Sequence, residues 1–214
     1  MIALSSMRPS INCCDEIAFN QMDAFESWLP VFERIIYFNQ PEEDYERDSV
    51  EFIEAEDFPT IREIAIEASQ QDGWSCLINA DIQVHPKLKV AMQVAESKGA
   101  LCAMSSRWEL PNNGDMCRAQ VVDNGLDFFA ATPDVWAGVA KQIPEAYRIS
   151  HPVWDTWVLG YFMKNHGFRC ADLTGSRVIY HPKHEDRRHP KPVNYNRNDP
   201  VLKAVRYPTL KIAV

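Results

Sequence analysis

The chain has 214 residues, of which 46% are hydrophobic and 24% charged, and this suits one domain with a packed core, or one domain with a tail. Its net charge of −8 argues against general nucleic-acid binding, because such binding neutralises phosphates with basic residues. Nucleic acid is therefore a possible partner, but the negative net charge does not favour it. The sequence contains no run of about 18 apolar residues, so no transmembrane segment is expected.

Short apolar runs alternate with stretches of helical periodicity, which predicts an α/β fold. In chain order, the expected strands are Ile2–Ser5, Arg34–Asn39, Val50–Glu54, Trp74–Asn79, Ala100–Ser105, Leu126–Ala131 and Arg177–Tyr180. The expected helices are Asp23–Phe32, three that begin near Pro59, Pro86 and Pro133, and Val153–Asn165. This order predicts a central, mostly parallel mixed sheet with helices on both faces and ligands at the carboxyl ends of its strands.

The six cysteines include no CxxC pair, and the first residues do not have the pattern of a signal peptide. Both features indicate reduced thiols and a cytoplasmic location. The charge is uneven along the chain, since residues 183–214 hold eight Lys or Arg against three acids. We expect one domain over residues 1–185 and a basic tail, residues 186–214, that packs on the domain or extends from it.

Asn79-Ala80-Asp81 ends a strand that is expected to be buried. A carboxylate at such a position is held by a rigid strand and is open to solvent, as a metal site on a diphosphate requires. Oxygen ligands of this kind suit Mg²⁺ or Mn²⁺. The alternative is that Asn79 and Asp81 only cap a turn.

Asp155 lies near the expected start of a helix, between Trp154 and Trp157. Apolar neighbours would raise its pKa, which suits a general base, and a flanking Trp could stack on a sugar ring. The alternative is that Asp155 only complements the helix dipole.

Two further patterns have both a functional and a structural interpretation. His181 and His184 follow the last expected strand as H-x-x-H, which could ligate a metal or form a solvated basic loop. Gly125, just before an apolar strand, could let a ligand approach the backbone closely, or could belong to a hairpin turn.

These features occur in the chain order of the landmarks of GT-A glycosyltransferases, and residues 1–185 resemble that family. The resembling residues are Asn79-Ala80-Asp81 for its DxD motif, Gly125 for its glycine loop, Trp154-Asp155 for its xED motif, and His181 or His184 for its C-terminal metal-binding histidine. The chain departs from the family at Asn79, where a carboxylate is usual. That departure predicts weaker metal binding, or greater dependence on the histidines.

The resemblance implies a single GT-A-like, Rossmann-related domain that moves a sugar from a UDP- or GDP-sugar to an unknown hydroxyl acceptor, with inversion expected. Mn²⁺ or Mg²⁺, bound by Asp81 with His181 or His184, would neutralise charge on the leaving diphosphate. Asp155 would take the proton from the acceptor hydroxyl. The residues that would contact the donor are Ser6, Arg8, Asn39, Asn79, Asp81 and Gly125.

Three alternatives stay open. A nucleotidyltransferase of related fold usually carries a glycine-rich phosphate loop after its first strand, whereas residues 5–10 contain no glycine. A nucleotide-sugar binding module that has lost catalysis would account for Asn79. A zinc hydrolase would use the histidines at 181, 184 and 189.

Overall fold

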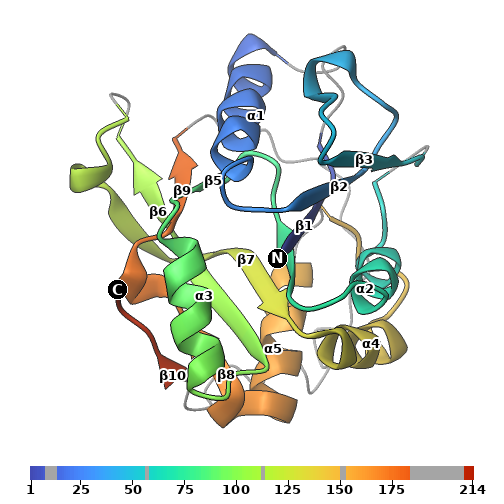
Figure 1. Ribbon diagram of the computed structural model, residues 1–214, viewed down its shortest axis with the longest axis vertical. Coiled ribbons are helices and arrows are strands. Elements are labelled where there is room, and N and C mark those ends of the chain that lie inside the picture. The colour runs from blue at the N-terminus through green and yellow to red at the C-terminus, as the bar shows by residue number, and fades with distance from the viewer. Residues whose placement is uncertain (8–13, 56–57, 112–113, 150–152, 184–209) are drawn as a thin grey trace.

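The computed structural model describes residues 1–7, 14–55, 58–111, 114–149, 153–183 and 210–214 (Figure 1). Within these ranges the chain forms one 10-stranded sheet with helices on both faces. The strands are β1 (Ile2–Ser5), β2 (Arg34–Phe38), β3 (Val50–Ile53), β4 (Ser75–Ile78), β5 (Gln83–Val84), β6 (Cys102–Leu110), β7 (Gln120–Ala131), β8 (Cys170–Asp172), β9 (Ile179–Pro182) and β10 (Leu210–Lys211). The α-helices are α1 (Asp15–Trp28), α2 (Ile61–Ser69), α3 (Leu88–Ser97), α4 (Pro133–Gln142) and α5 (Trp154–His166).

The strand order is β10-β8-β6-β7-β4-β1-β2-β3, with β9 beside β6 and β5 beside β9. The pairs β1–β2, β1–β4, β2–β3, β6–β8, β6–β9 and β8–β10 are parallel. Only β7, against β4 and β6, and the short pair β5–β9 are antiparallel among the described strands. The expected mostly parallel mixed sheet of an α/β fold is therefore confirmed.

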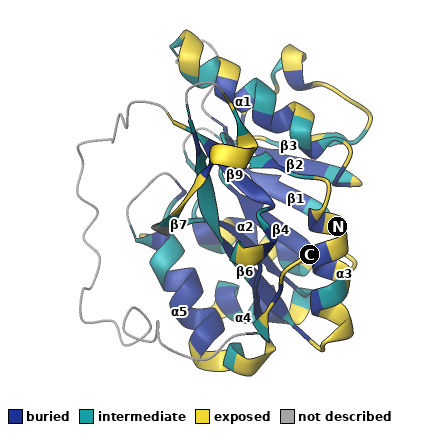
Figure 2. Cartoon of the chain, turned by 90° about the vertical axis from the view of Figure 1, so that its left-hand side faces the viewer, coloured by how far each residue is buried: buried dark blue, intermediate teal, exposed yellow. Residues whose placement is uncertain are grey.

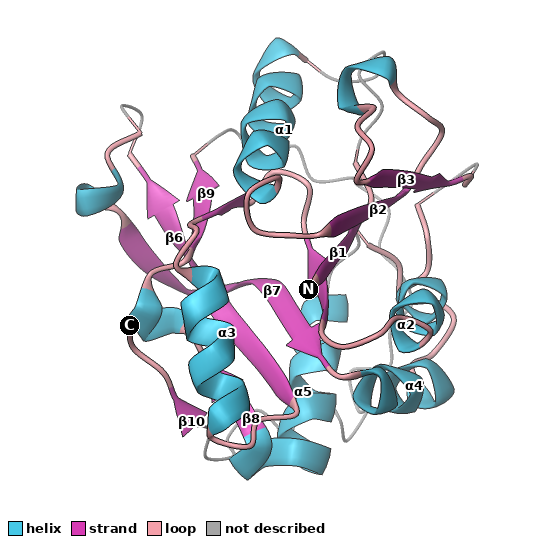
Figure 3. Cartoon of the chain, in the orientation of Figure 1, coloured by secondary structure: helices cyan, strands magenta, loops and turns pink. Residues whose placement is uncertain are grey.

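The sheet is buried on both faces because successive residues of a strand point to opposite sides. In β2, Ile35 and Tyr37 join the core under α1 and α3, whereas Ile36 and Phe38 join the core under α2, α4 and α5. Figure 3 shows α3 in front of the sheet and α5 behind it. Figure 2 shows buried strands between helices whose outer surfaces are exposed.

Helix boundaries differ from the sequence-based expectation for local reasons. Helix α1 begins at Asp15 and not at Asp23, and its first turn carries Asp15 and Glu16, which complement the helix dipole. It ends at Trp28: Leu29 still has helical backbone and bonds the carbonyl of Phe25, but Pro30 has no N–H with which to continue the helix. Helix α2 begins after a capping box in which Thr60 and Glu63 bond each other's backbone N–H groups.

Two expected loops are parts of strands. Gly125 lies within β7, not in a hairpin turn, because β6 and β7 stay paired from Cys102 to Glu109. Between these two ends β7 bulges: Ser106 pairs with Leu126 but Trp108 pairs with Val121, so β7 has more residues than β6 over this stretch. His181 lies within β9 and not after a strand, since β9 pairs with β6 through Glu109 and His181.

The end of the chain returns to the sheet. Residues 184–209, most of the expected basic tail, lie outside the described residues, but Leu210–Lys211 forms β10 beside β8. The next residue, Ile212, is fully buried in the core under α1 and α3. No helix in the described ranges is long and apolar enough to cross a membrane.

Candidate functional site

The carboxyl ends of the parallel strands β1, β2 and β4 lie at one edge of the sheet, where Ser6, Asn39 and Asn79 follow them. The Ser6 hydroxyl donates a hydrogen bond to the carbonyl of Phe38 (3.2 Å). The amide of Asn39 accepts from the N–H of Met7 (2.7 Å) and donates to the carbonyl of Met7 (2.5 Å). Asn39 thereby extends the pairing of β1 with β2, which is a structural role.

Asn79 is bonded across the sheet to Asp127 of β7. Its side-chain nitrogen Nδ2 lies 2.5 Å from Oδ1 of Asp127, and its backbone N–H donates to the carbonyl of Asp127 (3.4 Å). An aspartate at position 79 could not donate the side-chain bond when ionised. The amide at this position therefore has a physical reason: it binds a neighbouring carboxylate.

Asp127 is held from a second side by Arg107 of β6, whose Nη1 lies 2.9 Å from Oδ2 of Asp127. Burial raises the pKa of Asp127; Arg107 and His181 lower it, while the charge of Asp81 raises it, and the net shift is upward. Asp127 therefore interacts electrostatically with the residues on which metal binding was predicted. Neither Arg107 nor Asp127 was predicted from the sequence as a site residue.

Asp81 and His181 meet although they are 100 positions apart in the sequence. Oδ2 of Asp81 lies 3.4 Å from Nε2 of His181, and His181 is largely buried. The imidazole is positioned by β9, which is fixed between β5 and β6. The third predicted ligand, His184, lies outside the described residues, as does the predicted donor contact Arg8.

Asp155 lies in the first turn of α5, and its Oδ1 accepts a hydrogen bond from the N–H of Thr156 (2.7 Å). Burial raises its pKa, bonds from Thr156 lower it, and the charge of Asp127 raises it, with an upward net shift. Val153, two residues before Asp155, has the left-handed backbone conformation (φ 70°) that β-branched residues avoid. Such strain often accompanies functional sites, where it fixes the direction of a neighbouring element.

Taken together, the acids at 81, 127 and 155 and the imidazole at 181 form one electrostatically connected group. Among the described residues no three His, Cys, Asp or Glu side chains are arranged to hold a metal by themselves. Asp81 and His181 could supply one carboxylate and one imidazole to a cation that takes its other ligands from a substrate and water.

The sheet and its helices form a GT-A-like fold. The structure is similar to crystal structures of S. aureus TarS. For TarS residues 1–349 the TM-score is 0.57 at 10% identity, over 85% of this chain and 60% of that chain. For the same TarS fragment in complex with UDP-GlcNAc the TM-score is 0.56 at 9% identity, over 87% of this chain and 59% of that chain.

The chain thus spans about 60% of the length of the TarS 1–349 chain that it matches. No protein-family model matches the sequence, and no curated protein matches it. At 9–10% identity, the likeness to TarS establishes the fold and leaves the chemistry to be argued from the site.

Proposed function

We propose that this protein is a metal-dependent glycosyltransferase that moves a hexose-type sugar from a nucleoside-diphosphate sugar to a hydroxyl acceptor. The observation that carries the proposal is the contact between Asp81 and His181 on a GT-A-like fold, with both charges acting on Asp127, and Asp127 in turn acting on Asp155. TarS was crystallised with UDP-GlcNAc, so a UDP-sugar is the first donor to test and a GDP-sugar the second.

On this proposal, Asp81 and His181 would hold Mn²⁺ or Mg²⁺ together with the donor diphosphate. The metal would supply positive charge that stabilises the departing nucleoside diphosphate. Asn79 would keep its bond to Asp127 and would thereby leave Asp81 as the metal-binding carboxylate of its motif. Ser6, Arg8, Asn39 and Gly125 stay predicted donor contacts.

Asp155 would act as general base. It would take the proton of the acceptor hydroxyl while the acceptor oxygen bonds to the anomeric carbon and the bond from that carbon to the diphosphate breaks, with inversion. The upward pKa shift caused by burial suits this role, because a base works best when its pKa approaches the working pH. The bond from Thr156 fixes one carboxylate oxygen and orients the other.

The test is a donor binding and turnover assay with UDP-GlcNAc, other UDP-sugars and GDP-sugars, in Mn²⁺ and in EDTA. Asp81→Ala should abolish metal-dependent donor binding, whereas Asp72→Ala, an exposed acid in the turn before β4, should leave binding intact. Metal-dependent binding equal in both variants would refute the proposed metal site.

A second candidate function is a nucleotide-sugar binding module without catalysis. It is favoured by Asn79, because the amide leaves only one carboxylate in the motif after β4. Calorimetry beside the turnover assay separates the two functions: donor binding without hydrolysis or transfer supports the module, and Mn²⁺-dependent release of UDP supports the enzyme.

A further inference from the structure

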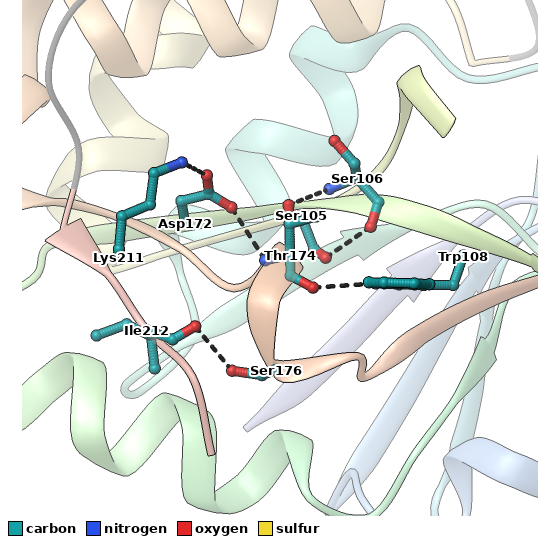
Figure 4. Close-up of polar contacts among 8 residues, drawn as sticks. All are labelled: Ser105, Ser106, Trp108, Asp172, Thr174, Ser176, Lys211 and Ile212. Atoms are coloured by element: carbon teal, nitrogen blue, oxygen red, sulfur yellow. Dashed lines mark hydrogen bonds and ion pairs between the residues drawn. The ribbon is translucent and has the colours of Figure 1, made fainter. Parts of the chain in front are cut away.

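A pocket of about 430 Å³ lies at the β8–β10 edge of the sheet, within the size range of small-molecule sites. Figure 4 shows its polar residues, which come from three parts of the chain. Ser106 belongs to β6, Asp172 ends β8, and Thr174 begins the 3₁₀ turn η5 (Thr174–Ser176). Lys211 of β10, with Ile212 and Ala213 after it, completes the lining.

The two charged groups of the pocket neutralise each other. Lys211 Nζ is paired with Oδ2 of Asp172, and Oδ1 of Asp172 accepts from the N–H of Thr174 (2.9 Å). Burial raises the pKa of Asp172, but the bonds from Lys211 and Thr174 outweigh it and hold the pKa below its usual value. The pocket therefore contains one carboxylate and one ammonium at neutral pH, with no net charge.

Unused hydrogen-bonding capacity remains around this ion pair. A carboxylate accepts about four bonds and an ammonium donates three, whereas Asp172 accepts three bonds and Lys211 donates one to it. Thr174 Oγ1 accepts from the N–H of Ser106 (3.0 Å), and the Thr174 hydroxyl also bonds Asp172. Ser106 also lines the pocket, and Ala213 adds an aliphatic surface, whereas the side chain of Ile212 is buried in the core.

Hydrogen-bond donors and an acceptor, an aliphatic surface and zero net charge match an uncharged sugar, which has hydroxyls around a C–H surface. We propose that this pocket binds a neutral saccharide unit, and that in the transfer reaction this unit belongs to the acceptor. The binding of a saccharide depends on the pocket alone, while its role as acceptor rests on the proposed function.

The pocket and the candidate active site share the strand β6. Ser106 lines the pocket, and the next residue, Arg107, binds Asp127. The indole N–H of Trp108 donates to the carbonyl of Thr174 (3.0 Å), which fixes η5 against β6. A saccharide seated between Ser106 and Thr174 would therefore lie beside the strand that carries Arg107.

The test is an NMR titration of the full chain with three probes that differ in charge: methyl β-D-glucopyranoside, glucosamine and glucose 6-phosphate. We expect the neutral glycoside to bind most tightly and to shift the amide signals of Thr174, Lys211 and Ala213. Hydrogen exchange of the Ile212 amide, which donates to the carbonyl of Asp172 (3.0 Å), should slow when the glycoside binds. No saturable shift at these residues would overturn the proposal.

The matched variants are Lys211→Met, which leaves Asp172 unpaired, and Lys89→Met, an exposed lysine on α3. Lys211→Met should change the preference toward glucosamine by up to about fivefold, the range of an exposed ion pair. Lys89→Met should behave as the original chain. Equal probe preferences in Lys211→Met and Lys89→Met would overturn the proposal.

Donor binding, measured on the same samples with UDP-GlcNAc and Mn²⁺, separates this inference from the proposed function. If the original chain binds the glycoside but no nucleotide sugar, the proposed function fails while the saccharide pocket stands. If Lys211→Met abolishes UDP-GlcNAc binding, the pocket belongs to the donor site, and the assignment to the acceptor is wrong.

Discussion

Replacing Asn79 with aspartate would reverse one contact at the centre of the candidate site. In the native chain, Asn79 Nδ2 donates to Oδ1 of Asp127 over 2.5 Å. In Asn79→Asp, two carboxylates would face each other with their charge centres about 4 Å apart. At an effective dielectric constant of about 20, two unit charges at this separation repel by about 4 kcal/mol. Since about 1.4 kcal/mol is tenfold, the doubly ionised pair is disfavoured roughly a thousandfold, before the attraction of Arg107 offsets part of this.

The pair would therefore retain a proton in the folded chain at a pH where both carboxyls are ionised in the unfolded chain. A carboxyl whose pKa is raised by folding contributes stability that is fully present below its unfolded pKa, about 4, and is lost as the pH rises. As the pH rises from 5 to 8, the temperature of thermal unfolding of Asn79→Asp should consequently fall, relative to that of a variant that loses the bond without gaining charge.

The assay is thermal unfolding in EDTA across this pH range, with Asn79→Ala as the matched control. Added Mn²⁺ should raise the transition of Asn79→Asp more than that of the native chain, because the variant has a second carboxylate next to Asp81. Parallel pH profiles for Asn79→Asp and Asn79→Ala would refute the geometry on which the candidate site depends.

Asp155→Asn should reduce turnover by a factor of about 10²–10⁴ and spare donor binding; unchanged turnover would refute the base assignment. Burial raises the pKa of Asp155, so native turnover should rise as the pH goes from acidic to neutral and the carboxyl ionises. Gly138→Ala should lower the free energy of unfolding in urea by up to about 2 kcal/mol. Its new Cβ clashes with the Tyr161 hydroxyl, and the better helix propensity of alanine offsets only about 1 kcal/mol of that cost. Adding Tyr161→Phe to this variant should restore the lost stability. Ile212→Ala should lower the free energy of unfolding in urea by about 2–5 kcal/mol. An unchanged free energy of unfolding would show that the chain end does not pack on the core.

The parts of the fold that could be predicted from the sequence are those with a long apolar pattern. The strand Ile2–Ser5 was predicted with its observed bounds, because its apolar run ends at polar residues. The strands β5, β8 and β10 were missed, because two or three residues are too few to show a period. The first turns of α1 were missed because they carry no continuous apolar stripe.

Within the site, Asp81 was recognisable because it follows a buried strand and is therefore at a sheet edge. Asp127 and Arg107 lie inside strands, and there a polar residue is most often one that points to solvent. Their contact depends on the register of β6 against β7 and of β7 against β4. Register is a long-range property, so one sequence without its partners could not reveal it.

Bringing the charged residues of the site close together costs free energy of folding. Burial raises the pKa of both Asp127 and Asp155, so their ionised forms are less stable in the folded chain than in water. Arg107 compensates Asp127 in part, but Asp81 adds a further negative charge nearby. A divalent cation at Asp81 and His181 would reduce this repulsion, so loading the site should stabilise the fold more as the pH rises and the acids ionise. A structural cluster without a ligand would instead be most stable where one acid holds its proton.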